Sequence, residues 1–289
     1  FKKNIPLDKQ LLVNEIFKRE IAAIYRCDLT LIISKFESDF LMDGFHIPKE
    51  IVHYIPMFYK TINQEQLKKY PTFENRTHFI SIGNFLHQPN WEAVLLLKAS
   101  IWSKIKKQLP ESELHIYGAY LPEKAKQLNN IKEGFIVKGR AESSQEVFTK
   151  ARVLLAPLPF GAGIKGKLIE SMQYGTPNVT TNIGAEGMQN GLPWNGFIED
   201  DFEDFATKAI QLYRDKSVWE EAQINGITLL NSNFNSNDYE TPFITKINDL
   251  KQNLALHRNH NFMGQILNHH TLKSTMYMSK WIEEKNSNK

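Results

Sequence analysis

One loop of the sequence concentrates residue types that can bind a phosphorylated ligand. It follows an apolar run with a proline-rich end and reads Gly161-Ala-Gly-Ile-Lys-Gly-Lys167. Glycines let the backbone approach a ligand closely, and a helix expected to begin near Gly166 presents free amides and the positive end of its dipole. Lys165 and Lys167 add two positive charges at the same place. These residues predict a site for a diphosphate.

Glu170 lies one helical turn beyond the loop. A carboxylate there can accept hydrogen bonds from vicinal hydroxyl groups, such as those of a ribose. The helix is expected to end at Gly175-Thr-Pro177, because glycine and proline stop helices. A simpler interpretation stays open for each feature: the loop is only a tight turn with solvated lysines, and Glu170 lies on an ordinary exposed helix face.

The loop also matches the sequence motif G-x-G-x-x-G, at Gly161, Gly163 and Gly166, and Glu186 lies twenty residues after the last of these glycines. This pattern is typical of a dinucleotide-binding fingerprint. We reject that interpretation, since the fingerprint belongs in the first strand-to-helix turn of its domain and this loop follows several such units. Two prolines also separate the glycines from their strand, and lysines are unusual where backbone amides hold the pyrophosphate.

Alternating strands and helices must position this loop. Strands are expected at 79–83, 114–118, 135–138, 153–156 and 178–181, and helices at 91–108, 167–174, 202–214 and 218–230. Such alternation predicts an α/β fold with a Rossmann-like parallel sheet and helices on both faces. Ligands of these sheets bind at the carboxyl ends of the strands.

The flanking segments differ in character. Before the sheet we expect a helix over 8–26, a strand over 29–34, a helix over 36–43, a strand over 51–55 and a polar linker over 57–76. From about residue 238 the pattern is helical. The expected organisation is an N-terminal part over 1–76, the sheet domain over 77–236 and a helical C-terminal tail over 237–289.

The composition limits the other classes of function. Of 289 residues, 42% are apolar and 23% charged, and the formal charge of +3 gives no reason to expect a nucleic-acid partner. That small charge suits an anionic small ligand or a peripheral contact with anionic lipid. Cys27 is the only cysteine, so an internal disulfide and a thiolate metal cluster are excluded, which fits a cytoplasmic protein.

The ends and the apolar runs of the sequence bear on localisation. No stretch approaches the roughly 18 apolar residues that a transmembrane helix needs, and the first residues lack the pattern of a signal peptide. Because the chain begins at Phe1, we expect further residues upstream.

An ordered series of segments resembles the donor-binding C-terminal lobe of GT-B glycosyltransferases of family 4, the group 1 glycosyl transferases. It comprises Phe79–Asn90, Leu114–Gly118, Val137–Gly139, Ala151–Pro157, the glycine loop through Glu170, Gly175–Thr181 and Ile183–Gly187. Residues 8–56 resemble the end of the family's acceptor lobe, and the helical tail resembles the segment that crosses back to it.

The resemblance implies transfer of a sugar from a UDP- or GDP-linked donor, with retention of configuration and no required metal, to a polysaccharide or glycolipid precursor. Glu170 matches the second glutamate of the family's E-x7-E motif, which holds the donor ribose. The amides around Lys167 and Leu168 match those that bind the diphosphate, while Arg140 and Ala141 fall where the family places the nucleobase. Glycines at strand ends, Gly83, Gly118 and Gly139, match those that line the donor cleft.

The complete set of expected donor-binding residues is Gly83, Asn84, His87, Gly118, Arg140, Ala141, Gly161, Ala162, Gly163, Ile164, Lys165, Gly166, Lys167, Leu168 and Glu170. His87 has two interpretations, as a polar group facing the cleft or as part of a helix-entry loop with Asn90 as N-cap. The adjacent pair His269-His270 is not expected to bind a metal, because neighbours on a helix point apart.

Three departures from the family pattern stand out. The first glutamate of the motif is replaced by Ala162, and the usual Arg and Lys after the first strand are replaced by Asn84 and by Pro89 or Asn90. We therefore hypothesise that Lys165 and Lys167 supply the charge for the phosphates. Most of the acceptor lobe, with its catalytic histidine loop, is absent, and no catalytic residue is predicted.

Two alternative functions stay open, a donor-lobe binding module without activity of its own and a nucleotide-sugar epimerase, for which no convincing acid-base pair is found. An N-terminal part without the rest of its lobe should expose apolar surface. We therefore expect a homodimer, formed by exchange of terminal segments.

Overall fold

The computed structural model of the protein describes residues 14–287, and its chain divides into two compact units. Met57–Ser236 form the first, which we call the sheet unit. The second, the terminal unit, joins residues 14–56 to residues 237–287. The first residues of the helix expected over 8–26 lie outside the described part of the chain.

The sheet unit contains the expected parallel sheet. Its strands are β3 (Phe79–Asn84), β4 (Leu114–Ala119), β5 (Phe135–Gly139), β6 (Val153–Ala156), β7 (Asn178–Thr180) and β8 (Gly196–Ile198). They lie in the order β5-β4-β3-β6-β7-β8, and every neighbouring pair is parallel. The α/β prediction is confirmed. The three-residue edge strand β8 is not among the predicted strands, because it is short and only partly buried.

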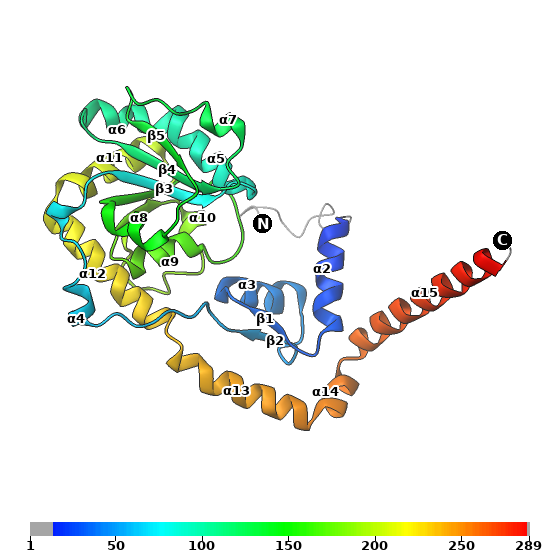
Figure 1. Cartoon of the computed structure of the whole chain (residues 1–289). Helices are drawn as coiled ribbons and strands as arrows, with labels where there is room; N and C mark the ends of the chain where they lie inside the picture. Colours follow the sequence, from blue (N-terminus) through cyan, green and yellow to red (C-terminus); the bar gives the residue numbers. More distant parts are fainter. Residues whose placement is uncertain (1–13, 288–289) are drawn as a thin grey trace. The chain divides into compact units, whose positions relative to one another are not determined.

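Helices cover both faces of this sheet (Figure 1). One face packs against α5 (Gln88–Leu96), α6 (Trp102–Gln108) and α11 (Phe202–Arg214), and the other against α8 (Ser144–Lys150), α9 (Gly166–Gln173) and α10 (Asn182–Ala185). The long α12 (Lys216–Asn233) contributes side chains to both cores. The short α7 (Glu123–Lys126) precedes β5. Successive side chains of a strand point to opposite faces, so Phe79 enters one core and Ile80 the other. Both side chains are fully buried.

The helix expected over 91–108 differs in detail. It begins earlier, at Gln88, because Pro89 is well suited to the first turn of a helix. His87 therefore occupies the N-cap position that was expected for Asn90. A π-helical turn, Leu97–Ile101, then separates α5 from α6.

The segment over 57–76, expected to be a polar linker, packs as part of the sheet unit. It contains α4 (Gln64–Leu67) and a 3-10 turn, Phe73–Asn75. Arg76 at its end is 0% exposed. Its guanidinium donates hydrogen bonds of 2.8 to 3.2 Å to Thr176 Oγ1 and to the carbonyl oxygens of Pro71, Phe148, Ala151 and Tyr174. Since α8 and α9 end at these carbonyls, Arg76 ties the ends of both helices together.

The terminal unit is built from both ends of the described chain. It contains α2 (Glu15–Arg26), β1 (Thr30–Ile32), α3 (Lys35–Asp39), a π-helical turn (Phe40–Gly44), β2 (Val52–Tyr54), α13 (Asn237–Gln252), α14 (Leu254–His260) and α15 (Phe262–Ser287). Strands β1 and β2 are parallel. Arg258 donates two hydrogen bonds of 2.8 Å to the carboxylate of Asp28, which fixes the tail to the N-terminal segment.

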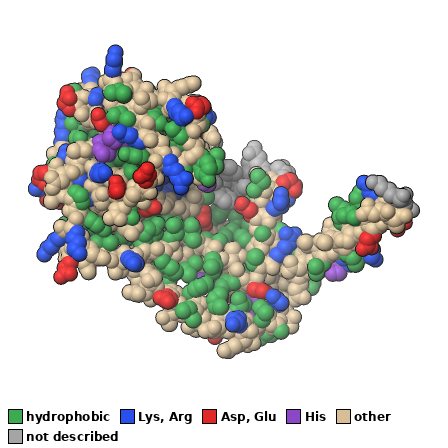
Figure 2. Space-filling model, viewed as in Figure 1, with side chains coloured by type: hydrophobic (Ala, Val, Ile, Leu, Met, Phe, Trp, Pro, Cys, Tyr) green, Lys and Arg blue, Asp and Glu red, His purple; other side chains and the backbone are tan. Residues whose placement is uncertain are grey.

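The face of the sheet unit that Figure 2 shows has no strong separation of charge. On the visible face of the sheet unit, at the upper left of Figure 2, acidic and basic side chains are interspersed. This distribution agrees with the small net charge of +3. None of the helices within residues 14–287 has the length and apolar character that a membrane span requires.

Candidate functional site

The order of the strands creates a crevice at one place in the sheet. The chain proceeds outward from β3 to β4 and β5 and then returns to place β6 on the other side of β3. The loop after β3 consequently leads to α5 on one face, whereas the loop after β6 leads to α9 on the opposite face. In open α/β sheets, ligands bind at such a reversal, outside the carboxyl ends of the strands.

Lys167 places its ammonium group at this reversal. Its Nζ donates a 2.7 Å hydrogen bond to Oδ1 of Asn90, in the first turn of α5. The Nδ2 atom of Asn90 in turn donates to the carbonyl oxygen of Asn84, at the end of β3, over 2.9 Å. A side chain from α9 therefore reaches across to the loop after β3, and the two loops that form the crevice are joined by a cation.

Among residues 14–287, no carboxylate forms an ion pair with this cation. Burial lowers the pKa of Lys167 from its usual 10.5 to about 8. A positive charge held in a poorly solvated place without an anionic partner is stabilised by an anionic ligand. The site therefore favours an anion such as a phosphate group.

The backbone beside Lys167 is open. The N–H groups of Gly166 and Lys167 are in the first turn of α9, where no earlier helical carbonyl accepts them. A Cβ atom added to Gly163 or Gly166 would have no heavy atom within 4 Å. Free amides, the positive helix end and open space together provide the geometry of an anion site.

Lys165 has a different task from Lys167. Its Nζ donates hydrogen bonds to the carbonyl oxygens of Gly161 at 3.2 Å and Gly163 at 2.6 Å. These two glycines adopt left-handed φ angles of +137° and +72°. The ammonium of Lys165 thus braces the loop from inside. Both lysines were expected to supply charge to the phosphates. Because the Lys165 ammonium is bonded to the loop carbonyls, Lys167 is the stronger candidate of the two.

Glu170 lies on the same helix and is half-buried. Burial raises its pKa above the usual range. Burial also raises the pKa of Tyr59, and the nearby charge of Glu170 adds to that effect. The carboxylate therefore does not lie on a fully exposed helix face, and it remains available as a hydrogen-bond acceptor for hydroxyl groups.

Glycine is needed at the ends of β3 and β4 for two different structural reasons. A Cβ atom at Gly83 would lie 2.8 Å from Asn90 and 3.0 Å from Nζ of Lys167, so this glycine makes room for the pair at the crevice. At Gly118 a Cβ atom would lie 1.9 Å from the ring of Phe85. Gly118 therefore accommodates packing of Phe85, whatever else it contacts.

The other expected residues are spread around this centre. The side chain of Leu168 is fully buried in the core and its N–H group, which was expected to bind the diphosphate, donates a hydrogen bond to the carbonyl oxygen of Lys165 at 2.9 Å. Ile164 packs against the same core. Ala162 and His87 are exposed. Arg140 and Ala141 instead line a different hollow of about 320 Å³, beside the α8 helix. The structure thus brings Gly83, Asn84 and Lys167 together through Asn90, whereas Arg140 and Ala141 line the other hollow.

Two contributors were not expected from the sequence. Asn90 was considered as a helix cap and as a position where the family's usual lysine is replaced, yet it holds the Lys167 ammonium. Tyr59 lies near Glu170 although it belongs to the supposed linker. A wide separation along the chain hides such contacts from local patterns. Within residues 14–287, no three His, Cys, Asp or Glu side chains gather in an arrangement that could hold a metal ion.

Comparison with known proteins identifies a family that the sheet unit resembles. Residues 76–215, just under half of the chain, match the family Glycosyl transferases group 1. This part of the chain is similar to a group 1 glycosyltransferase domain. The matched range contains the whole crevice, from β3 through α9, and the resemblance seen in the sequence is confirmed.

A curated relative and several solved structures agree with this assignment. The "Uncharacterized 44.6 kDa protein in cps region" of Klebsiella pneumoniae is 23% identical over 235 residues, which cover 78% of this chain and 57% of the relative. A mutant of TarM from S. aureus, crystallised with Fondaparinux, alpha-GlcNAc-glycerol and UDP, has a TM-score of 0.67 at 14% identity, covering 84% of this chain and 48% of that structure.

A second structural relative is the pneumococcal O-GlcNAc transferase GtfA in complex with UDP and GlcNAc. Its TM-score is 0.62 at 15% identity, with 82% of this chain and 48% of that structure covered. These likenesses show the GT-B glycosyltransferase fold. The chain spans about half the length of both structures.

Proposed function

We propose that the sheet unit is a group 1 glycosyltransferase domain that binds a nucleotide diphosphate sugar in the crevice between the loops after β3 and β6. Lys167 and the first amides of α9 hold the diphosphate, and Glu170 accepts hydrogen bonds from the ribose. The observation that carries the proposal is the ammonium of Lys167, fixed by Asn90 at the reversal of the strand order.

The chemical consequence is stabilisation of the leaving group. When the bond between the sugar and the diphosphate breaks, negative charge grows on the phosphate oxygen. A preorganised cation and helix amides stabilise that charge without rearrangement, because they are fixed before the reaction begins. UDP is the preferred test ligand, since both crystallised relatives described above contain it.

The whole reaction that we propose is transfer of the donor sugar with retention of configuration to a polysaccharide or glycolipid precursor in the cytoplasm. The relative named for a cps region supports a polysaccharide product. The groups on this chain act on the donor side. Donor binding is therefore the part of the function that can be tested first.

Calorimetric titration of the full chain with UDP and with inorganic pyrophosphate separates the proposed roles. Lys167→Met removes the cation and should weaken both ligands by about thirtyfold, which corresponds to about 2 kcal/mol for a charged hydrogen bond. Glu170→Gln should weaken UDP by about tenfold and leave pyrophosphate unchanged, because only UDP carries a ribose.

Lys107→Met is the matched control, since Lys107 is an exposed lysine on α6. It should bind both ligands as the unmodified protein does. The proposal is wrong if Lys167→Met keeps normal UDP affinity. Equal losses of UDP and pyrophosphate in Glu170→Gln would remove the ribose role of that carboxylate.

A second candidate function is a donor-binding module that does not catalyse transfer by itself. The exposed Ala162 favours it, because this position offers no carboxylate to the donor sugar. Release of UDP from UDP-sugars by the purified chain distinguishes the two candidates. Binding without release of UDP supports the module, whereas release supports an active transferase.

A further inference from the structure

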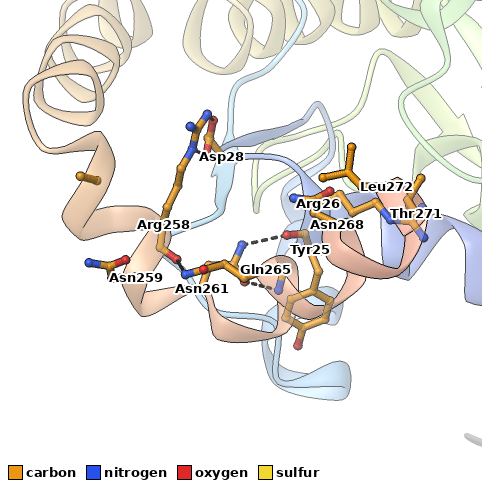
Figure 3. A pocket seen from close by; sticks show the side chains of 12 residues that line it. Tyr25, Arg26, Asp28, Arg258, Asn259, Asn261, Gln265, Asn268, Thr271 and Leu272 are labelled. Carbon is orange, nitrogen blue, oxygen red and sulfur yellow. Dashed lines mark hydrogen bonds and ion pairs between the residues drawn. The ribbon is translucent and has the colours of Figure 1, made fainter. Parts of the chain in front are cut away.

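The terminal unit contains a polar pocket that the donor site does not use. It has a volume of about 700 Å³ and lies among α2, α14 and α15 (Figure 3). Sites for small molecules have volumes of roughly 300–1,000 Å³. The lining includes six planar hydrogen-bonding side chains, Arg26, Arg258, Asn259, Asn261, Gln265 and Asn268.

Hydrogen bonds hold one wall of this pocket in place. Asn261 Nδ2 donates to the carbonyl oxygen of Tyr25 at 2.8 Å, and Gln265 Nε2 donates to the carbonyl oxygen of Arg258 at 2.7 Å. Arg258 also makes its two bonds to Asp28. Because Tyr25 and Asp28 are remote in sequence from α14 and α15, the wall forms only where the two ends of the chain meet.

Other lining groups are left with unused hydrogen-bonding capacity. The side chains of Arg26, Asn259 and Asn268 make no hydrogen bond or ion pair with any residue within the described range 14–287. Figure 3 shows Arg26 of α2 beside Asn268 and Leu272 of α15. Arg258 is neutralised by Asp28, so among the lining residues the positive charge of Arg26 is left uncompensated.

The chemistry of these groups selects a class of ligand. Planar amide and guanidinium groups form paired hydrogen bonds with neighbouring hydroxyls and with carboxylates. Most of the residues that line the pocket have polar side chains, and Leu272 and Ala255 are its aliphatic members. We propose that this pocket binds an acidic glycan, with its carboxylate on Arg26 and its hydroxyl groups on Asn259 and Asn268.

The choice of a glycan rests on the proposed function, in which the chain acts on a growing saccharide. The pocket would then hold a portion of that saccharide. Its occupant is distinct from the nucleotide, because none of the residues that line it belongs to the sheet unit. The two proposals can therefore fail independently.

Saturation-transfer NMR on the full chain tests the proposal with three probes, D-glucuronate, D-glucose and cyclohexanecarboxylate. Glucuronate should bind about tenfold more tightly than glucose, because only glucuronate pairs with Arg26. It should also bind more tightly than cyclohexanecarboxylate, which has the charge but no hydroxyls. Arg26→Gln should remove the preference for glucuronate over glucose, and Asn268→Ala should weaken both sugars.

Arg19→Gln is the matched control, since Arg19 is an exposed arginine of the same helix that does not line the pocket. It should retain the full preference. The proposal is overturned if glucuronate gives no saturation transfer, if cyclohexanecarboxylate binds equally well, or if Arg26→Gln behaves as the control does.

UDP affinity measured on the same samples separates the two sites. If the protein binds UDP but not glucuronate, only the proposal for the pocket is overturned. If the protein binds glucuronate but not UDP, only the proposal for the donor site is overturned. The pocket is then a glycan-binding site that serves a different function.

Discussion

The lowered pKa of Lys167 makes a specific prediction about how donor binding depends on pH. In the free protein, burial holds this pKa at about 8. A bound diphosphate supplies negative charge beside the amine, which favours the protonated form and raises the pKa. Binding must then take up a proton. The affinity for UDP should therefore fall as the pH rises through about 8.

The magnitude follows from the fraction of Lys167 that carries its proton in the free protein. With a pKa of about 8, this fraction is about 0.9 at pH 7 and about 0.1 at pH 9. The dissociation constant of UDP should thus be about tenfold larger at pH 9 than at pH 7, or about 1.4 kcal/mol in binding free energy. Near pH 8, about half a proton should be taken up per UDP bound.

Isothermal titration calorimetry in two buffers of different ionisation enthalpy measures both the affinity and the number of protons taken up. The control is Lys167→Arg, whose guanidinium stays protonated throughout this range. Its affinity should not show the tenfold loss. Proton loss from the nucleotide base affects both proteins alike and is removed by comparing them.

Two results would refute this reasoning. A wild-type affinity that does not change between pH 7 and pH 9 would mean that the Lys167 ammonium does not face the diphosphate. An equal loss in Lys167→Arg would assign the pH dependence to another group.

Three further predictions concern stability of the sheet unit, measured as the free energy of unfolding in urea. Gly118→Ala should cost about 1–3 kcal/mol, because its Cβ atom would overlap the ring of Phe85; Phe85→Leu should reduce that cost, and an unchanged cost would contradict the packing explanation. Burial and then the neighbouring His115 lower the pKa of His78 from 6.5 to about 4. Because the His78 imidazole binds a proton at higher pH in the unfolded chain than in the folded one, the free energy of unfolding should fall as the pH drops below 6.5. The loss should be about 1–2 kcal/mol at pH 5 after allowing for partial exposure of the side chain. His78→Phe should flatten this dependence of stability on pH between pH 7 and pH 5, and a dependence equal to that of the wild type would exclude His78 as its source. Arg76→Met removes the donor to the carbonyl oxygens of Pro71, Ala151 and Tyr174 and should cost about 3 kcal/mol or more. A loss below about 1 kcal/mol would show that these bonds contribute little.

The sequence alone was sufficient to predict the sheet and to place the glycine loop at the carboxyl edge of its strands. Apolar runs bounded by turns revealed β3 to β7, and the glycine loop before α9 indicated where an anion could bind. Such signals are local, because strand length, helix periodicity and glycine usage are visible within a few residues. The short edge strand β8 lacks them, since it has three partly buried residues.

Contacts between distant segments could not be predicted in this way. Nothing near Arg76 in the sequence shows that it caps the ends of α8 and α9, and the polar character of residues 57–76 suggested a linker. Asn90 likewise gives no sign that it receives the ammonium of Lys167. Side-chain partners across a fold depend on tertiary packing, which overrides local composition.

The division of the chain has a consequence for its synthesis. The sheet unit occupies one continuous stretch, Met57–Ser236, and can fold as soon as that stretch has left the ribosome. Residues 14–56 emerge earlier but find Arg258 and Asn261 only after the last helices have been translated. The contacts between the earliest and the latest parts of the described chain therefore form last, after the small core around Ile47, Ile51 and Val52 within residues 14–56 has been synthesised.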